Sequence, residues 1–448
     1  MLSPLFSDLY QLNMMQAYLE HGLTEPASFE FFVRGLPARR GFLMAAGLEQ
    51  ALEFLETLRF PPEDLDWLAR SGRFGKVLLD ALAELTFEGD VEAMPEGTVF
   101  FPHEPILRVT SPLPIAQFVE TRLINLLHFQ SLIASKAARN VLAAPDKLLV
   151  DFGFRRAHGA EAGLMAARAS YLAGFSGTAT IEAGRRWDIP LYGTMAHAFV
   201  QAFDDEAEAF ERFAEARPDG LVLLLDTYDT VAAARKAVAL APHLRAKGVR
   251  IAGVRLDSGD LVALSKSVRS ILDDGGLEDT IIFASGGLDE DDLMAFASAG
   301  APIDGYGVGT SLAASADAPT LDCVYKLVEY AGRPRRKRST GKATWPGRKQ
   351  VFRRLDEDGR MALDVLTLEG DRQPGEALLQ PAMRGGRRVA PAPSLAEIRA
   401  HAADQLAKLP APLARLGVGT TYSVEVAQPL ARLSRDMDRA DDERNRDP

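Results

Sequence analysis

KLLVDFGF (147–154) is the first of six short apolar runs that each end in small or polar residues. The other five follow at similar intervals: DIPLYGTMAH (188–197), GLVLLLDTYD (220–229), RIAGVRLDSGD (250–260), TIIFASGGLD (280–289) and IDGYGVGTSL (303–312). Segments with helical periodicity lie between most of these runs. This alternation predicts βαβ units and a parallel sheet, and the unbroken succession of units favours a closed or nearly closed α/β barrel.

Both flanks of this region have a different character. Apolar residues at helical spacing predict helices within 44–58 and 61–86 and one long helix over 117–142. Residues 92–115 are rich in Pro and β-branched residues, which is typical of short antiparallel strands. The charged stretch 434–448 is expected to be disordered.

Composition excludes several classes of protein. The 448 residues are 47% hydrophobic and 25% charged, as in globular proteins of about two or three domains. The single cysteine, Cys323, excludes a disulfide framework and a site with several thiolate ligands. A net charge of −11 argues against a nucleic-acid partner. No apolar run reaches the roughly 18 residues of a membrane span, and the first residues do not resemble a signal peptide, so we expect a cytoplasmic protein without a membrane partner.

Two glycine-rich loops follow the last two predicted strands. Without Cβ atoms, such loops expose backbone N–H groups to a phosphate, especially if a helix starts near Ala313. Barrels commonly bind phosphate at their last two loops. The alternative is a pair of tight turns that need positive φ angles, but two consecutive loops of this kind favour the phosphate. The candidates are Ser285, Gly286 and Gly287 in one loop and Gly307, Gly309 and Thr310 in the other.

Arg255 and Asp257 in VRLDSGDL (254–261) are two residues apart, so both side chains are expected on one face of a strand. An ion pair that points into a barrel is a costly way to fill space. We interpret Arg255 as a ligand of an anionic group, and Asp257 and Asp260 as ligands of hydroxyl groups or Mg²⁺. A structural salt bridge is the alternative.

His197 has the most suggestive setting of the seven histidines, because it follows a Gly-Thr turn at Thr194 that could bind an anion. As a base or nucleophile it needs a partner that fixes its tautomer, and the sequence does not identify one. A solvated histidine is the alternative. At the end of the first run, Phe152 could stack on a flat ring, and Arg155 could pair with a carboxylate or diphosphate.

Residues 333–354 contain ten Lys or Arg and no Asp or Glu. Few aromatic residues accompany them, so we interpret the run as a mobile basic flap over a polyphosphate ligand rather than a nucleic-acid patch; a solvated basic face is the alternative. A phosphoribosyl diphosphate together with an aromatic acid would satisfy all of these features.

A set of motifs resembles the nicotinate phosphoribosyltransferases, in the same order along the chain: SDLYQLNMMQAYLEHG (7–22), FEFFVRGLP (29–37), AAGLEQALEFLE (45–56), FGFRRAHG (152–159), GTMAHAFV (193–200), LLDTYDT (224–230), GVRLDSGDL (253–261) and GVGTS (307–311). The resemblance implies a ligase-type glycosyltransferase of NAD salvage. Such an enzyme makes nicotinate mononucleotide and diphosphate from nicotinate and phosphoribosyl diphosphate. It uses Mg²⁺ and hydrolyses ATP through a phosphohistidine.

The resemblance also implies an irregular α/β barrel joined to an α+β domain built from both chain ends, and a head-to-tail homodimer with shared active sites. On this basis the expected boundaries are an N-terminal domain (1–135), the barrel (136–330), a basic flap and C-terminal part packing on the N-terminal domain (331–433) and the tail (434–448).

Residue roles follow from the same resemblance. His197 corresponds to the phosphorylated histidine, and Tyr10 of the partner subunit would stack on the pyridine ring opposite Phe152. Arg155 and Arg255 correspond to arginines near nicotinate and the diphosphate. Further diphosphate ligands would be the partner subunit's Arg34, with Lys326 and Lys337, while the two glycine-rich loops correspond to the 5′-phosphate loops.

Two alternatives stay open at this point. Nicotinamide phosphoribosyltransferases are similar but have an aspartate where this chain has Ala179, and an aspartate would repel a carboxylate substrate. A non-catalytic phosphoribosyl-binding barrel is the second alternative. One departure from the family is Gly286, where many relatives carry Asn or Asp to hold a ribose hydroxyl.

Overall fold

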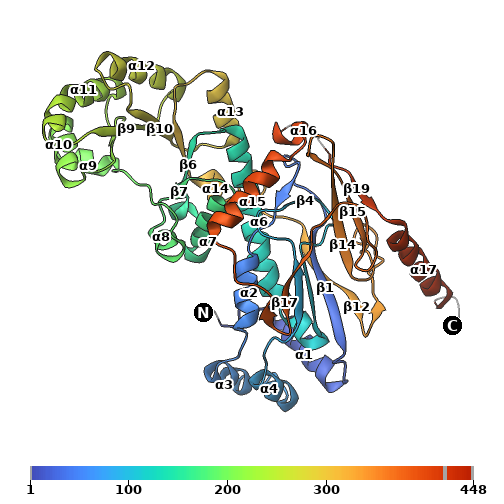
Figure 1. Ribbon diagram of the computed structural model, residues 1–448. Helices are drawn as coiled ribbons and strands as arrows, with labels where there is room; N and C mark the ends of the chain where they lie inside the picture. Colours follow the sequence, from blue (N-terminus) through green and yellow to red (C-terminus); the bar gives the residue numbers. More distant parts are fainter. Residues whose placement is uncertain (1–2, 417–420, 445–448) are drawn as a thin grey trace. The chain divides into compact units, whose positions relative to one another are not determined.

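The computed structural model describes residues 3–416 and 421–444 (Figure 1). The chain divides into two compact units. Unit 1 comprises Met1–Ser135 and Thr320–Pro448, and unit 2 comprises Lys136–Pro319. The division falls within the long helix α6 (Glu120–Ala143), close to the helix expected over 117–142.

Unit 2 contains a six-stranded parallel sheet with the order β7-β6-β11-β10-β9-β8. Its strands are β6 (Leu148–Asp151), β7 (Gly177–Thr178), β8 (Leu221–Leu224), β9 (Ile251–Leu256), β10 (Ile281–Ser285) and β11 (Gly305–Val308). The predicted parallel sheet is therefore confirmed. Among the described residues β7 and β8 do not pair with each other, so the sheet is open, and the closed barrel is not observed.

The missing strand explains the open sheet. The run 188–197 was expected to be a strand, but it forms only an isolated bridge between Leu191 and Thr178. Pro190 lacks an N–H donor and Gly193 weakens extended structure, so the segment cannot sustain a ladder. It runs instead as an irregular loop into α9 (His197–Gln201).

Helices connect the parallel strands. They are η1 (Phe154–Arg156), α7 (Ala160–Leu172), α8 (Ile181–Trp187), α10 (Glu206–Ala216), α11 (Thr230–Ala246), α12 (Leu261–Asp274), α13 (Glu290–Ser298) and α14 (Thr310–Ala313). Asp229, Asp260 and Asp289 cap α11, α12 and α13 by accepting hydrogen bonds from first-turn backbone N–H groups. Figure 1 shows α11, α12 and α13 arranged around β9 and β10.

Unit 1 is built around sheets whose strands pair antiparallel, except that β19 pairs with β15 in parallel. The largest has the order β13-β12-β1-β5-β3-β17-β18, a second has β16-β14-β15-β19, and β2 pairs with β4. The strands are β1 (Pro26–Val33), β2 (Leu43–Met44), β3 (Asp90–Ala93), β4 (Val99–Phe100), β5 (Leu107–Pro112), β12 (Cys323–Tyr330), β13 (Arg333–Pro334), β14 (Lys349–Leu355), β15 (Met361–Leu368), β16 (Glu376–Ala377), β17 (Gln380–Arg384), β18 (Arg387–Arg388) and β19 (Val424–Val426).

Segments from both chain ends share the largest sheet of unit 1, because β12 pairs with β1 and β17 pairs with β3. Its apolar face is buried with helices α1 (Leu9–Glu20), α2 (Leu48–Glu56), α3 (Pro62–Arg70), α4 (Lys76–Ala83) and α5 (Leu113–Phe118) in one core. Phe29 and Tyr325 stack there at 5.0 Å across the β1–β12 ladder. The remaining helices are α15 (Leu395–Ala407), α16 (Ala411–Ala414) and α17 (Gln428–Arg444). None of the helices described is long and apolar enough to cross a membrane.

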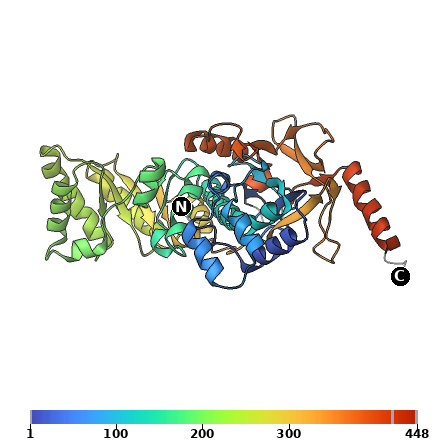
Figure 2. The same cartoon turned by 90° about the horizontal axis from the view of Figure 1, so that it is seen from below.

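Two expectations for the C-terminal part need correction. The second half of the basic run is not a mobile flap, because Lys349 and Arg353 lie in β14 and form buried ion pairs with Glu30 and Asp364. Residues 434–444 are not disordered but belong to α17, at the outer end of unit 1 (Figure 2). Leu430 anchors this helix in the core. The rest of the expected tail, 445–448, lies outside the described residues.

Candidate active site

Several residues predicted from the sequence, and Asp226 with them, lie at one edge of the parallel sheet of unit 2. Phe152, Asp226, Asp257, Gly286 and Gly309 each follow the carboxyl end of a strand. The carboxyl ends of parallel strands share one edge of the sheet, which is where α/β folds bind ligands.

Arg255 is the centre of the contacts at this edge. Its Nη2 donates to Asp257 Oδ1 at 2.6 Å, its Nε to Ser285 Oγ at 2.9 Å and its Nη1 to Thr194 Oγ1 at 3.2 Å. The guanidinium also lies over the Phe152 ring, 5.4 Å from its centroid. Three strands and the 188–197 loop thus hold one cation in place, with the side chain 12% exposed.

Asp257 is held ionised by these contacts. Burial alone would raise its pKa, but hydrogen bonds from Ser285 and Arg255 bring the pKa of Asp257 below its usual value. Its second oxygen, Oδ2, lies 4.0 Å from Nε2 of His197. The expected ion pair is therefore present, and its carboxylate also faces the candidate histidine.

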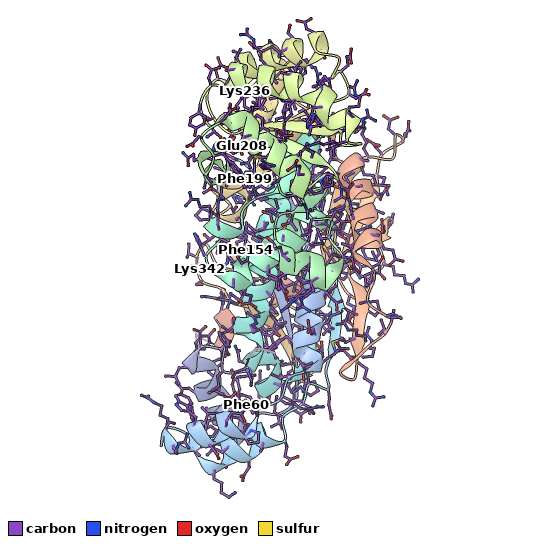
Figure 3. The ribbon with its side chains drawn as sticks, turned by 90° about the vertical axis from the view of Figure 1, so that its left-hand side faces the viewer. Phe60, Phe154, Phe199, Glu208, Lys236 and Lys342 are labelled. Carbon is purple, nitrogen blue, oxygen red and sulfur yellow. The ribbon has the colours of Figure 1, made fainter. Side chains whose placement is uncertain are left out.

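His197 begins α9, and the helix is anchored by aromatic packing. Phe199, labelled in Figure 3, lies with its ring centroid 5.3 Å from Phe203 and 5.3 Å from Phe213 of α10. The His197 ring itself is 40% exposed. Its Nδ1 lies 3.1 Å from Oγ1 of Thr227, which supplies the partner that sequence reasoning did not identify.

Asp226 is a residue that sequence reasoning missed, although the motif that contains it was recognised. Its Oδ2 accepts hydrogen bonds from the Asp257 backbone N–H at 3.0 Å and from Ser258 Oγ at 2.6 Å. Its Oδ1 is buried and has no hydrogen-bond partner among the described residues. Asp226 therefore fixes the loop that carries Asp257. The signal that could have identified Asp226 in the sequence was its position as an acidic residue at the end of a predicted strand, next to Thr227.

The two glycine-rich loops lie together, because β10 and β11 are neighbours with Ser285 opposite Gly307. The Ser311 hydroxyl also donates to the Leu288 carbonyl at 2.5 Å and ties one loop to the other. The helix that follows, α14, starts at Thr310, three residues before Ala313, and ends at Ala313.

Glycine is required in these two loops for two different structural reasons. Gly286 and Gly287 have φ angles of +106° and +75°, which favour glycine. A Cβ at Gly286 would also lie 2.0 Å from the Asp257 carbonyl oxygen. Gly307 and Gly309 do not have positive φ angles; Cβ atoms there would meet Phe152 atoms at 2.5 and 3.1 Å. The tight-turn alternative therefore applies to only one of the two loops.

The first strand end contributes an aromatic ring and free cations. Phe152 is partly buried and packs against Phe283 at 5.7 Å. Arg155 lies in η1 and is exposed, and its side chain has no ion-pair or hydrogen-bond partner among the described residues. Phe154 beside it is exposed as well, and Figure 3 shows its side chain. The structure thus brings Phe152 next to Arg255 but leaves Arg155 free at the surface.

The acidic residues do not form a closed metal site. Asp260, a candidate Mg²⁺ ligand, instead caps α12 by accepting a hydrogen bond from the Ala263 N–H at 3.0 Å. No group of three or more His, Cys, Asp or Glu side chains that could hold a metal occurs in the part of the chain that the structure describes. Of the aspartates described at this edge, Asp226 has a buried oxygen, Oδ1, without a hydrogen-bond partner.

The candidate residues of unit 1 form a separate group around Glu120 at the start of α6. Tyr10 donates to Glu120 Oε2 at 3.1 Å, and Lys326 Nζ lies 3.5 Å from Glu120 Oε1. Burial and the Glu120 carboxylate raise the pKa of Tyr10 to about 12, so its hydroxyl stays protonated. Sequence reasoning found Tyr10 and Lys326 but not the carboxylate that joins them.

Arg34 and Lys337 do not belong to this group. Arg34 Nη1 forms an ion pair with Asp322 Oδ1 at 3.1 Å, and the Asp322 side chain is largely exposed. Lys337 is exposed, and no ion pair involves its side chain among the described residues.

Comparison with known proteins relates these features to one family. The chain matches the nicotinate phosphoribosyltransferase (NAPRTase) N-terminal domain over residues 5–128, the NAPRTase family over 148–334 and the NAPRTase C-terminal domain over 375–434. It is 49% identical over 435 residues to nicotinate phosphoribosyltransferase pncB2 of Mycobacterium tuberculosis, covering 96% of this chain and 93% of that protein. It is 42% identical to the Bacillus subtilis nicotinate phosphoribosyltransferase, over 79% of this chain and 73% of that protein.

A solved structure agrees with the sequence matches. The crystal structure of human nicotinic acid phosphoribosyltransferase superimposes with a TM-score of 0.85 at 31% identity, over 96% of this chain and 99% of that chain. The mixed α/β fold is therefore shared along almost the whole length.

Proposed function

The chain belongs to the nicotinate phosphoribosyltransferase family, and from that premise we propose that it makes nicotinate mononucleotide and diphosphate from nicotinate and phosphoribosyl diphosphate in NAD synthesis. The observation that carries the proposal is the network that joins His197, Asp257 and Arg255 at the carboxyl edge of the parallel sheet. Such polar groups at this edge are the expected setting of a ligand site.

In the proposed reaction, the pyridine nitrogen attacks the anomeric carbon of the ribose while the bond from that carbon to the diphosphate oxygen breaks. The nitrogen lone pair is already free, so no base is needed. Catalysis then depends on positioning and on cationic stabilisation of the departing diphosphate. Arg255 suits this task because its guanidinium is already oriented by Ser285 and Thr194.

The substrate groups have matching positions in the proposal. The 5′-phosphate would bind the backbone N–H groups of the loops at Gly286 and Gly309, which Ser311 holds together. Phe152 would support the pyridine ring, and the free cation of Arg155 would meet the nicotinate carboxylate. Lys326 and Lys337, with Arg34 of the partner subunit, would add positive charge at the diphosphate.

The acidic residues fit Mg²⁺ held mainly by substrate oxygens. The unused buried oxygen of Asp226 is the protein atom that we propose faces the ion or its water, whereas Asp260 is engaged as a helix cap. Mg²⁺ bound in this way would neutralise the diphosphate. Asp226 also holds the Asp257 loop, so it serves both purposes.

ATP enters the proposal through His197. In the tautomer in which Nδ1–H donates to Thr227 Oγ1, the Nε2 lone pair is available to attack the γ-phosphorus of ATP, forming an N–P bond as ADP departs. Water later cleaves the N–P bond and releases phosphate. Asp257, 4.0 Å from Nε2, would stabilise the ring while it carries positive charge.

Exposed apolar side chains support a head-to-tail dimer with shared active sites. Both units carry them: Phe6, Leu9, Tyr10 and Trp67 in unit 1, and Phe154, Ile181, Leu191, Tyr192 and Tyr228 in unit 2. Exposed apolar groups of this kind mark interaction surfaces. Mixing Tyr10→Ala chains with His197→Ala chains should restore one good site per heterodimer. Absence of rescue, with subunit exchange demonstrated, would count against the shared site.

The first experiment measures nicotinate mononucleotide formation by the purified protein, with and without ATP. We expect His197→Ala to retain some transfer but to lose its stimulation by ATP. His243→Ala is the matched control, because His243 pairs with Glu211 on the helical surface, away from the strand ends. Retained ATP stimulation in His197→Ala would refute the role of His197, and no turnover with intact phosphoribosyl diphosphate binding would favour a non-catalytic binding protein.

The second experiment tests whether position 179 makes the protein selective for nicotinate, the acid, over nicotinamide, the amide. Ala179 is exposed directly after β7, at the same sheet edge, and its N–H donates to the Asp151 carbonyl at 2.8 Å. Ala179→Asp should raise the KM for nicotinate by about tenfold or more, because two carboxylates near 4 Å repel by about 1–4 kcal/mol at effective dielectric constants of 80 to 20. Ala179→Asn provides the uncharged control. An equal KM in all three proteins would contradict the assignment of this position.

A further inference from the structure

The first half of the basic run and the C-terminal helix are partners. Arg336 Nη1 donates to the Ser434 carbonyl and lies 3.1 Å from Asp438 Oδ2, and it also contacts the Ser434 hydroxyl. Arg338 lies 3.1 Å from Asp438 Oδ1 and donates to Asp442 Oδ1 at 2.8 Å, with Asp441 at 4.0 Å. Two arginines of the basic run thus pair with three aspartates of α17, about one hundred residues away in the sequence, within unit 1.

Lys337 stands between these two arginines and differs from both. It is exposed, and no described side chain forms an ion pair with it. Its backbone is fixed, because its N–H donates to Thr344 Oγ1 and its carbonyl accepts from the Thr344 N–H, both at 3.0 Å. The pair of bonds closes a loop whose tip carries Lys342, which Figure 3 shows. The loop therefore presents its lysines while its arginines are held.

We propose that the carboxylates of Asp438, Asp441 and Asp442, called here the α17 clasp, position Lys337 for the anionic substrate by holding Arg336 and Arg338. This inference rests on the proposed function, in which Lys337 binds the diphosphate. The clasp acts in two ways. It restrains the backbone on both sides of Lys337, which lowers the entropy lost when the lysine binds. It also pairs Arg336 and Arg338 with carboxylates, so that these two arginines do not compete with Lys337 for the anion.

The two arginines contribute differently to the clasp. The Arg336 side chain is only 10% exposed and contacts two groups of Ser434 besides Asp438, so it acts as a fixed anchor. The Arg338 side chain is 36% exposed, and salt screens ion pairs of this kind. The restraint on Lys337 should therefore weaken, without disappearing, as the ionic strength rises.

The test compares a triple variant, Asp438→Asn with Asp441→Asn and Asp442→Asn, with Asp436→Asn. Asp436 lies on the same helix and is exposed, without an ion-pair partner among the described residues, so it is the matched control. Hydrogen exchange of the 336–344 segment is measured on the full-length protein. We expect the Lys337 and Thr344 amides to exchange about tenfold faster in the triple variant only, since each tenfold change corresponds to about 1.4 kcal/mol. Unchanged exchange would overturn the inference.

Kinetics separate positioning from mere stability. The triple variant should raise the KM for phosphoribosyl diphosphate by about three- to tenfold and leave kcat within about twofold, as expected for a lost binding restraint. Adding Lys337→Ala to the triple variant should raise KM no further than Lys337→Ala alone, because both act through one side chain. Faster exchange with an unchanged KM would overturn the inference. An inactive wild-type protein would refute the proposed function instead. The hydrogen-exchange measurement does not depend on activity, so the two failures can be told apart.

Discussion

Arg255 in unit 2 and Arg353 in unit 1 make nearly the same contacts in opposite surroundings. Each guanidinium binds an aspartate and lies over a phenylalanine ring, Phe152 at 5.4 Å and Phe101 at 5.7 Å. The difference is access. The Asp364 side chain bound to Arg353 is fully buried, whereas that of Asp257 is 28% exposed. A sealed pair braces the fold, while an open pair at a strand end can exchange its partners for a ligand.

The largest effect is expected at the sealed pair. Arg353→Met should lower the free energy of unfolding by about 3–5 kcal/mol, because it leaves the buried Asp364 carboxylate without its cation. Urea denaturation followed by circular dichroism measures this loss. Arg354→Met, one residue along β14, is the control, since the Arg354 side chain forms no ion pair with the described residues and donates to the Pro374 carbonyl at 3.3 Å. A decrease in the free energy of unfolding below about 1 kcal/mol would show that the buried Arg353–Asp364 pair does not stabilise the fold.

The reciprocal substitution tests the open pair. Arg255→Met should reduce kcat/KM by about 10²–10³-fold, the usual cost of removing one preorganised charge donor, with the free energy of unfolding changed far less than in Arg353→Met. Steady-state transferase assays and urea denaturation measure the two quantities. Arg245→Met on the surface of α11 serves as the control. Near-normal kcat/KM combined with a large loss of stability would reverse the distinction between the two pairs.

A smaller effect concerns protons in the sealed region. Burial and the neighbouring Asp364 carboxylate raise the pKa of Glu104 well above its usual value, so the folded protein retains a proton that the unfolded chain releases. This contribution to stability is complete below about pH 4 and is lost as the pH rises toward the folded-state pKa, by at most about 1.4 kcal/mol per pH unit.

Glu104→Gln removes that proton and keeps the shape of the side chain. The free energy of unfolding of the wild-type protein should therefore decline relative to that of Glu104→Gln between pH 4 and pH 7, which urea denaturation at several pH values would show. Parallel pH profiles for the two proteins would contradict the assignment. The open pair offers no such buried proton, because Asp257 remains ionised.

The sequence predicted the regular parts of the molecule because their periodicity is local. The apolar runs at 220–229 and 250–260 contain β8 and β9, and α10 and α11 lie between predicted strands, as the helical periodicity indicated. The run 188–197 failed because its hydrophobicity resembles that of a strand, while Pro190 and Gly193 prevent a ladder. The hydrophobic pattern carries no information on whether a segment has the backbone N–H donors that pairing in a sheet requires.

Long-range partners were beyond the reach of the sequence. The pairing of Arg255 with Asp257 could be predicted, since the two are neighbours on one strand. The contact between His197 and Thr227 could not, because it depends on the approach of separate segments. The interpretation of the basic run as a mobile flap was wrong for the same reason. The sequence shows no acidic residue within the basic stretch. In the structure, Arg353 of β14 pairs with Asp364 on the neighbouring strand β15, and Arg338 pairs with Asp442 of α17.

The close approach of Gly286 to the Asp257 carbonyl has a consequence for how this enzyme can diverge. Any side chain at 286 begins with a Cβ atom, and that atom would lie 2.0 Å from the carbonyl oxygen. A lineage that gains a side chain at this position must therefore also displace the backbone at 257, together with the carboxylate that it carries. The contact therefore couples a side chain at 286 to the backbone at 257, whereas a side-chain substitution of Asp257 leaves the contact itself unchanged.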